Sequence, residues 1–187
     1  MTEKEKVRGM REERLLKNIT DQIKEAQIKL GYVRETVRLY YPLSSLKAIL
    51  QSEVTGLAQM KTQLEHNEVF QHSPLGPIRM EIHGDRMELS ISPEGCAYVH
   101  GQVDASPFLR DIIELFATHH ACSIAQVQEV FARYSTSYVC QQMEPGMDFD
   151  YVLYFTESGV DEYYYCVRME MGHTIYHRFM KEDFELL

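Results

Sequence analysis

Apolar residues recur in alternating steps of three and four from Leu16 to Tyr40. This spacing puts the apolar side chains on one side of a helix and is typical of a coiled-coil seam. Gly31 interrupts the series and costs the helix about 1 kcal/mol relative to alanine, so a kink or break is expected there. Pro42 ends the predicted helix, because the residue before a proline is pushed towards an extended conformation. The seam consists of Leu16, Ile19, Ile23, Ala26, Leu30, Val33, Val37 and Tyr40.

A second apolar seam follows Pro42, with four leucines seven residues apart. It predicts another helix that runs to about Glu65. Two seams joined by a short proline turn predict an antiparallel helical hairpin over residues 1–66. Each seam must be covered in water, either by the chain's own sheet or by a second chain in a homodimer. The four leucines are Leu43, Leu50, Leu57 and Leu64.

Residues 67–187 alternate between strand patterns and helix patterns. Ser106-Pro107 begins one predicted helix, and Ser123 with Gln126 forms the capping box of the next. The chain is therefore predicted to be α+β, with an antiparallel sheet of six or seven strands covered by helices on one side. The N-terminal helical hairpin lies on or beside this domain of residues 67–187. Apolar and polar residues alternate about Gly84-Asp85, which predicts a hairpin of strands over residues 78–83 and 86–92. Further strands are predicted over residues 96–100, 138–143 and 149–156, followed by a hairpin over 162–180.

The hairpin of residues 162–180 carries the strongest strand pattern, because aromatic and β-branched residues crowd both of its arms. Either Met171-Gly172 or Gly172-His173 can form a two-residue hairpin turn, in which the glycine takes the positive φ that such turns need. Any even-numbered loop gives the same two faces, since side chains alternate along a strand. The more apolar face, with Tyr165 and Val167, is expected to meet the core.

The residues of the candidate site lie on the other face of this hairpin. An even loop places Cys166 opposite His177, which is typical of a thiol–imidazole nucleophile if the thiol pKa is lowered. A three-residue loop would exchange the partners and dissolve the cluster. The tyrosines of the hairpin are expected to pack the sheet with hydroxyls that reach water. The alternative is a concave tyrosine-lined face that holds a ligand or peptide. The candidate pocket comprises Tyr164, Cys166, Arg168, Glu170 and His177.

No metal site and no cofactor are predicted. His119, His120 and Cys122 share one turn, but no complete tetrahedral ligand set accompanies them. His173 and His177 lie four residues apart, which in a strand separates them by roughly 13 Å. The sequence contains no P-loop, Rossmann glycine motif, HExxH or GxSxG motif.

Charge is distributed unevenly along the chain. Residues 1–66 carry 12 Lys and Arg against 9 Asp and Glu, whereas residues 67–187 carry 7 against 19. The acidic part argues against nucleic acid as a partner, although two helices there have the lengths of a helix–turn–helix motif. No apolar run approaches the roughly 20 residues that cross a bilayer, so no membrane association is expected. The charged N-terminus and four widely spaced cysteines predict a cytoplasmic protein.

Four stretches resemble a known family. They are IKEAQIKLGYVRETVRLYYPLSSL, SIAQVQEVFARYS, FDYVLYFT and DEYYYCVRMEMGHTIYHRF, which together span most of the chain. The family comprises uncharacterised bacterial proteins from Firmicutes and is a domain of unknown function. The resemblance implies a bacterial cytoplasmic protein, but it implies no activity, cofactor or catalytic residue.

The sequence thus favours a non-enzymatic cytoplasmic interaction or scaffold protein, with a protein partner that it does not identify. The alternative is a small-molecule-binding protein or enzyme that uses the thiol and imidazole of the C-terminal hairpin.

Overall fold

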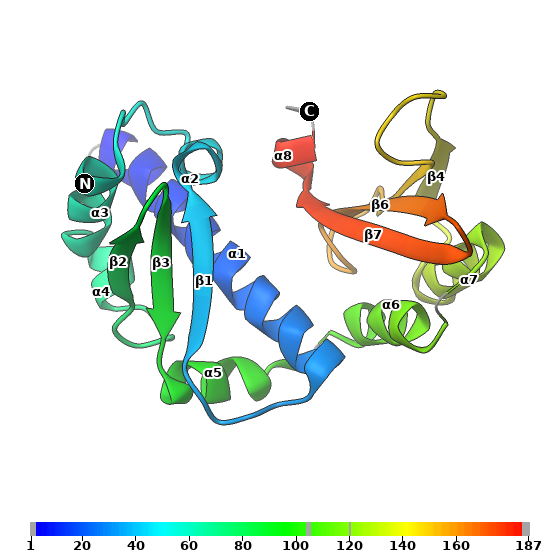
Figure 1. The fold of residues 1–187 in the computed structure, drawn as a ribbon, viewed down its shortest axis with the longest axis horizontal. Coiled ribbons are helices and arrows are strands. Elements are labelled where there is room, and N and C mark those ends of the chain that lie inside the picture. Colours follow the sequence, from blue (N-terminus) through cyan, green and yellow to red (C-terminus); the bar gives the residue numbers. More distant parts are fainter. Residues whose placement is uncertain (1–2, 104–105, 120, 185–187) are drawn as a thin grey trace. The chain divides into compact units, whose positions relative to one another are not determined.

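The computed structural model describes residues 3–103, 106–119 and 121–184 and divides the chain into two compact units, residues 1–104 and 105–187. Each unit combines helices with one antiparallel sheet (Figure 1), which confirms the predicted α+β class. The single sheet that the sequence predicted is therefore two sheets. Among the described residues, no helix combines the length and the apolar character needed to cross a bilayer.

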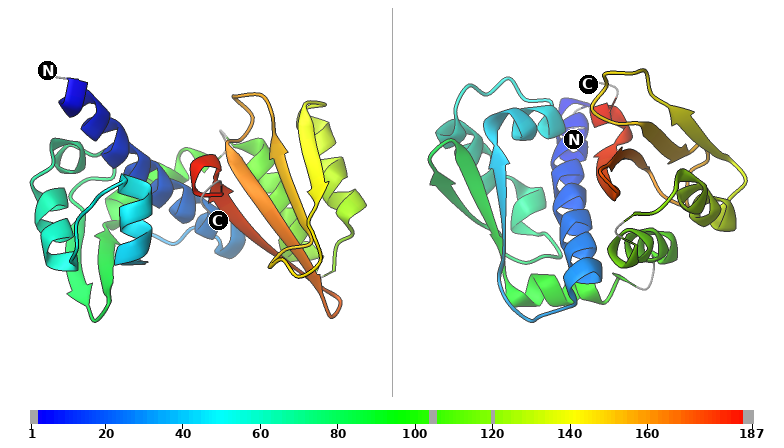
Figure 2. Two further views of the ribbon diagram at one scale, coloured as in Figure 1. Left: turned by 90° about the horizontal axis from the view of Figure 1, so that it is seen from above. Right: turned by 45° about the vertical axis from the view of Figure 1, so that its right-hand side comes forward.

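The first unit packs helices against a three-stranded sheet. The sheet has the order β1-β3-β2, and its inner face shares a core with α1 (Figure 2). Met87, Leu89 and Ile91 of β3 are fully buried in this core, as are Ile19 and Ile23 of α1. Its elements are α1 (Glu3–Leu30), β1 (Val37–Pro42), α2 (Leu43–Leu50), α3 (Leu57–Glu65), α4 (Glu68–Gln71), β2 (Arg79–His83), β3 (Arg86–Ile91) and α5 (Pro93–His100).

The predicted helical hairpin of residues 1–66 is replaced by a helix, a strand and shorter helices. The first helix ends at Leu30, and Gly31 follows in the left-handed conformation at φ 82°. Residues 37–42 form strand β1, which pairs with β3 instead of extending α1. The second predicted helix is broken between α2 and α3, where Gln51 adopts φ 46°.

The division of the chain falls between residues 104 and 105, and not near residue 66 as the sequence suggested. The physical reason is the pairing of β1 with β3, which joins residues 37–42 to residues 86–91 in one sheet. The seam residues Ile19, Ile23 and Leu64 are fully buried in this unit's own core. A homodimer through the seams stays a prediction, and it would have to use seam positions that remain exposed, such as Leu30 and Val33.

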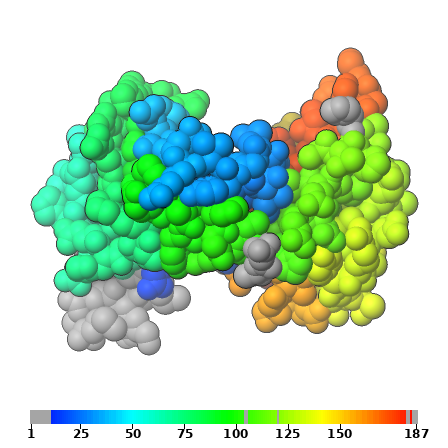
Figure 3. Space-filling view, turned by 90° about the horizontal axis from the view of Figure 1, so that it is seen from below, coloured from blue at the N-terminus to red at the C-terminus, as the bar shows by residue number. Residues whose placement is uncertain are grey.

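The third predicted strand, residues 96–100, is part of helix α5. Ser92 caps this helix by accepting a hydrogen bond from the amide of Gly95, and Pro93 occupies its first turn. The segment after α1 lies against α5 (Figure 3). The rings of Tyr32 and His100 stack at 4.0 Å, and Arg34 forms an ion pair with Glu94.

The second unit places two helices on one face of a four-stranded sheet (Figure 2). The sheet has the order β4-β5-β6-β7, and the capping box predicted at Ser123 and Gln126 is present. Tyr165 of β6 is fully buried against Phe108 and Phe131, so the face predicted to meet the core does so. Its elements are α6 (Pro107–Thr118), α7 (Ile124–Tyr134), β4 (Tyr138–Gln142), β5 (Tyr151–Phe155), β6 (Tyr163–Glu170), β7 (His173–Met180) and α8 (Lys181–Phe184).

Candidate functional site

The C-terminal hairpin has the two-residue loop that the candidate cluster requires. Met171 and Gly172 both have positive φ, at 49° and 78°, and β6 pairs with β7 on either side of them. Cys166 is the cross-strand partner of His177, and Glu170 is the partner of His173. The five candidate residues therefore lie on one face of the sheet, as the alternation predicted.

Burial separates these five residues into two groups. Tyr164 and Cys166 are buried in a small aromatic cluster, in which the Tyr164 ring lies 4.2 Å from that of Tyr154 and 4.9 Å from that of Phe184. Arg168 and Glu170 are half-exposed and form an ion pair at 3.5 Å. His177 is exposed, and its ring lies 5.5 Å from that of Phe149.

The chemistry of Cys166 is opposite to that of an activated nucleophile. Its side chain is fully buried, and this burial raises the thiol pKa to about 12. A reactive cysteine needs a lowered pKa and an exposed sulfur. A nearby cavity of about 310 Å³ is lined by Tyr164 but by none of the other four candidate residues. Tyr164 and Cys166 therefore contribute to the packing of the sheet, and the cluster lacks the activated thiol that a reactive centre needs.

The histidines and cysteines do not assemble a ligand set within the described residues. No group of three or more His, Cys, Asp or Glu side chains in that part of the chain is arranged to hold a metal ion. His120 lies outside the described residues. Cys122 is buried, and its backbone amide and carbonyl both bond to the Thr174 hydroxyl at 3.0 Å, which ties the α6–α7 turn to β7.

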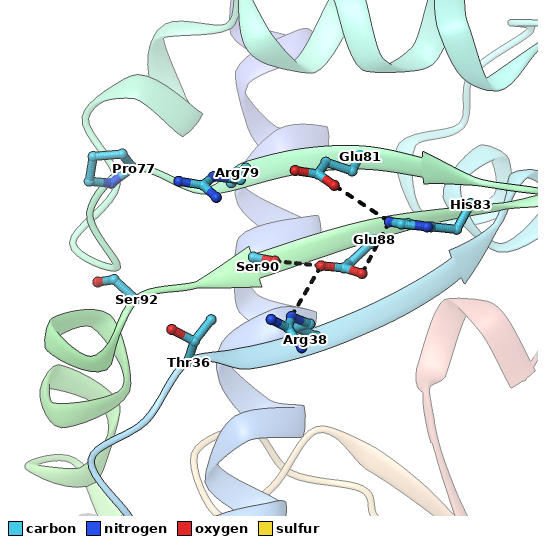
Figure 4. A pocket seen from close by; sticks show the side chains of 9 residues that line it. All are labelled: Thr36, Arg38, Pro77, Arg79, Glu81, His83, Glu88, Ser90 and Ser92. Atoms are coloured by element: carbon cyan, nitrogen blue, oxygen red, sulfur yellow. Dashed lines mark hydrogen bonds and ion pairs between the residues drawn. The ribbon is translucent and has the colours of Figure 1, made fainter.

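A different polar cluster occupies the outer face of the three-stranded sheet (Figure 4). The register aligns the side chains in rows that cross all three strands. Arg38 and Arg79 are both partners of Ser90, which therefore lies between them. In the next row, Tyr40 and Glu81 flank Glu88 in the same way. Because faces alternate along a strand, these rows lie opposite the core face of Met87 and Leu89.

Glu88 is the centre of this cluster. It is only 7% exposed, and its carboxylate accepts a hydrogen bond of 2.7 Å from the Ser90 hydroxyl. The carboxylate also lies 3.3 Å from an imidazole nitrogen of His83 and 3.4 Å from the Arg38 guanidinium. Hydrogen bonds from Ser90 and Tyr40, together with these basic neighbours, lower the Glu88 pKa. The hydrogen bond between Tyr40 and Glu88 also raises the pKa of Tyr40, whose hydroxyl keeps its proton and is the donor.

An open pocket of about 500 Å³ lies over these rows. The Arg79 guanidinium has no hydrogen-bond or ion-pair partner among the residues that the structure describes, so its donors are available to a ligand. The pocket is lined by Thr36, Arg38, Pro77, Arg79, Glu81, His83, Glu88, Ser90 and Ser92.

Sequence reasoning missed this site. Arg38 and Tyr40 were assigned to a helix, so nothing brought them to Glu88, which is about fifty positions further along the chain. The available signal was the alternation of residues 37–42, in which Arg38 and Tyr40 share one side and Leu39 and Tyr41 the other.

No curated protein and no solved structure matches this chain. A family model does match, and it covers residues 12–187, which comprise most of the first unit, all of the second unit and every residue that lines the pocket over β1, β2 and β3 (the outer-face pocket). Its description is a domain of unknown function named after an E. rectale gene. Because the match extends over nearly the whole chain, this protein belongs to that family, DUF3877.

Proposed function

We propose that this protein is a non-enzymatic binding protein that holds a small charged molecule in the outer-face pocket. The observation that carries the proposal is the pocket itself, which is open, has a volume of about 500 Å³ and is polar or charged at every lining position except Pro77. Small-molecule sites fall in this range of volumes and hold their ligands by a few convergent polar groups.

The electrostatics of the pocket favour binding over reaction. Glu88 has a lowered pKa, so its carboxylate is a weak proton acceptor and a poor general base. The Ser90 hydroxyl donates to that carboxylate, which orients it as part of the pocket floor. The thiol of Cys166, the nucleophile suggested by the sequence, is buried and holds its proton at neutral pH.

The cytoplasm is the compartment that best fits this proposal. All four cysteines, Cys96, Cys122, Cys140 and Cys166, are free thiols. Free thiols persist in reducing compartments, whereas cysteines in secreted proteins commonly form disulfides.

Protein-detected NMR tests the proposal with defined charged compounds: glycine, γ-aminobutyrate, succinate, inorganic phosphate and phosphoethanolamine. At least one of them is expected to shift the amide signals of Arg38, Arg79 and Ser90 in a saturable way, and its own spectrum should stay unchanged over hours. Arg79→Gln should weaken the binding that causes these shifts, whereas Arg133→Gln, which removes an exposed charge on helix α7 outside the pocket lining, should not. Shifts confined to other parts of the chain, or conversion of the bound compound, would overturn the proposal.

A further inference from the structure

We infer that the ligand of the outer-face pocket carries two opposite charges, a carboxylate or other oxyanion at one end and an ammonium group at the other. This inference rests on the proposed function and names the class of molecule that the pocket holds. It follows from the order in which charges are laid out across the three strands.

The pocket has a basic end and an acidic end. Arg38 and Arg79 are aligned across the sheet on either side of Ser90. In the adjacent row, Glu88 lies two positions before Ser90 on β3, and its neighbour Glu81 lies two positions after Arg79 on β2. Residues two apart on a strand are separated by roughly 7 Å and point to the same face, so two rows of opposite charge lie side by side.

The basic end is equipped to bind an oxyanion. Arg79 has no partner among the described residues, and the Arg38 side chain is 63% exposed although one of its nitrogens pairs with Glu88. Each guanidinium can present two parallel N–H donors to one carboxylate or phosphoryl group. The side chains of Thr36 and Ser92 line the same end of the pocket (Figure 4).

The acidic end is equipped to bind an ammonium group, and Glu81 is the residue that would accept it. Glu88 is already engaged by Ser90, Arg38 and His83 and is nearly buried. The Glu81 side chain is 52% exposed, and its single ion-pair or hydrogen-bond partner among the described residues is His83, at 3.6 Å. Its carboxylate therefore retains acceptor capacity that faces the pocket.

A ligand with one charge fits this arrangement less well. The two arginines and two glutamates of the lining offset each other, so the pocket has little net attraction for a lone anion or a lone cation. An anion held at the arginines also lies roughly 7 Å from the glutamate row, which repels it. An ammonium group on the same molecule turns that repulsion into attraction.

Three compounds of one length test the inference by isothermal titration calorimetry: 6-aminohexanoate, hexanoate and hexylammonium. The extended 6-aminohexanoate places its charges on the order of 7 Å apart. It is expected to bind about fivefold more tightly than hexanoate, the gain of one partly exposed ion pair, and hexylammonium is expected to bind most weakly. Equal affinities for 6-aminohexanoate and hexanoate would overturn the inference and leave the proposed function standing.

Two variants locate the ends of the ligand. Arg79→Gln should lower the affinities for 6-aminohexanoate and hexanoate by the same factor. Glu81→Gln should remove the tighter binding of 6-aminohexanoate and leave the affinity for hexanoate unchanged or slightly higher. Arg133→Gln, on helix α7 and outside the pocket lining, should change the affinity for neither compound. If Glu81→Gln weakens both compounds equally, or if neither compound binds the wild-type protein, the inference is wrong. The proposed function is then judged by the NMR compounds alone.

Discussion

The hydroxyl of Ser90 donates a 2.7 Å hydrogen bond to the carboxylate of Glu88, two positions earlier on the same strand. Both side chains point away from the core, because Met87 and Leu89 fill the alternate positions and are fully buried. This bond is the largest cause of the lowered Glu88 pKa, followed by the hydrogen bond from Tyr40. A charged group thus sits, nearly buried, at the floor of an open pocket.

Replacing Ser90 by alanine should raise the pKa of Glu88 towards its ordinary value of 4.5. The charged carboxylate loses its strongest donor, and hydrogen bonds to the charged form are what favour it. Carbon-detected NMR titration of the glutamate carboxyl signals measures the change. Ser44→Ala, on the exposed side of α2, is the control and should leave the Glu88 titration where it is. An unchanged Glu88 pKa in Ser90→Ala would contradict the assigned hydrogen bond.

At low pH, the charged carboxylate of Glu88 should no longer contribute to the free energy of unfolding. The folded pKa lies below the unfolded value of 4.5, so the contribution is present above pH 4.5 and is lost as the pH falls through the folded pKa. The difference in unfolding free energy between wild type and Glu88→Gln should therefore shrink as the pH falls from 7 to 3. Urea unfolding at several pH values measures it, and a difference that grows on acidification would contradict the sign of the shift.

Local signals predicted the second unit better than the first. The turn at Met171-Gly172 and the capping box at Ser123 depend on neighbouring residues, and both are present in the structure. In the first unit, the segment 37–42 fits two periodicities: Val37 and Tyr40 continue the heptad spacing, while Leu39 and Tyr41 alternate as in a strand. Residues 37–42 form a strand because they pair with β3, and β3 is remote in sequence from them.

Helices α5 and α6 begin with the same two residue types, a serine followed by a proline. Ser106-Pro107 predicts a helix start, and Ser92-Pro93 carries the same signal, although the residues that follow it were predicted as a strand over 96–100. The outer-face pocket could not be assembled from sequence for a different reason. Its two arginines come from opposite edge strands, and only the register of both pairings brings them to Ser90.

Gly95 is expected to tolerate no side chain. A Cβ atom there would collide with the carbonyl oxygen of Leu75 and lie 2.8 Å from Cγ2 of Ile91. Gly95→Ala should destabilise the protein by roughly 1–3 kcal/mol, the cost of overpacking a close contact. Gly101→Ala is the matched control, because its Cβ would lie 3.5 Å from the nearest atom, the carbonyl oxygen of Tyr98. Chemical denaturation compares the two, and equal stabilities would show that α5 can move away from Leu75.

Cys166 should resist alkylation in the folded protein. Burial raises its pKa to about 12, so at pH 8 only about one molecule in ten thousand carries the thiolate that reacts with iodoacetamide. Cys140, on edge strand β4, is partly exposed and should be labelled first, although burial raises its pKa too. Peptide mass spectrometry at successive times distinguishes the two sites, and unfolding in urea should equalise them. If Cys166 instead reacts at least as fast as Cys140 in the folded protein, its sulfur is accessible and ionised, and the thiol–imidazole pair with His177 becomes the better candidate for chemistry.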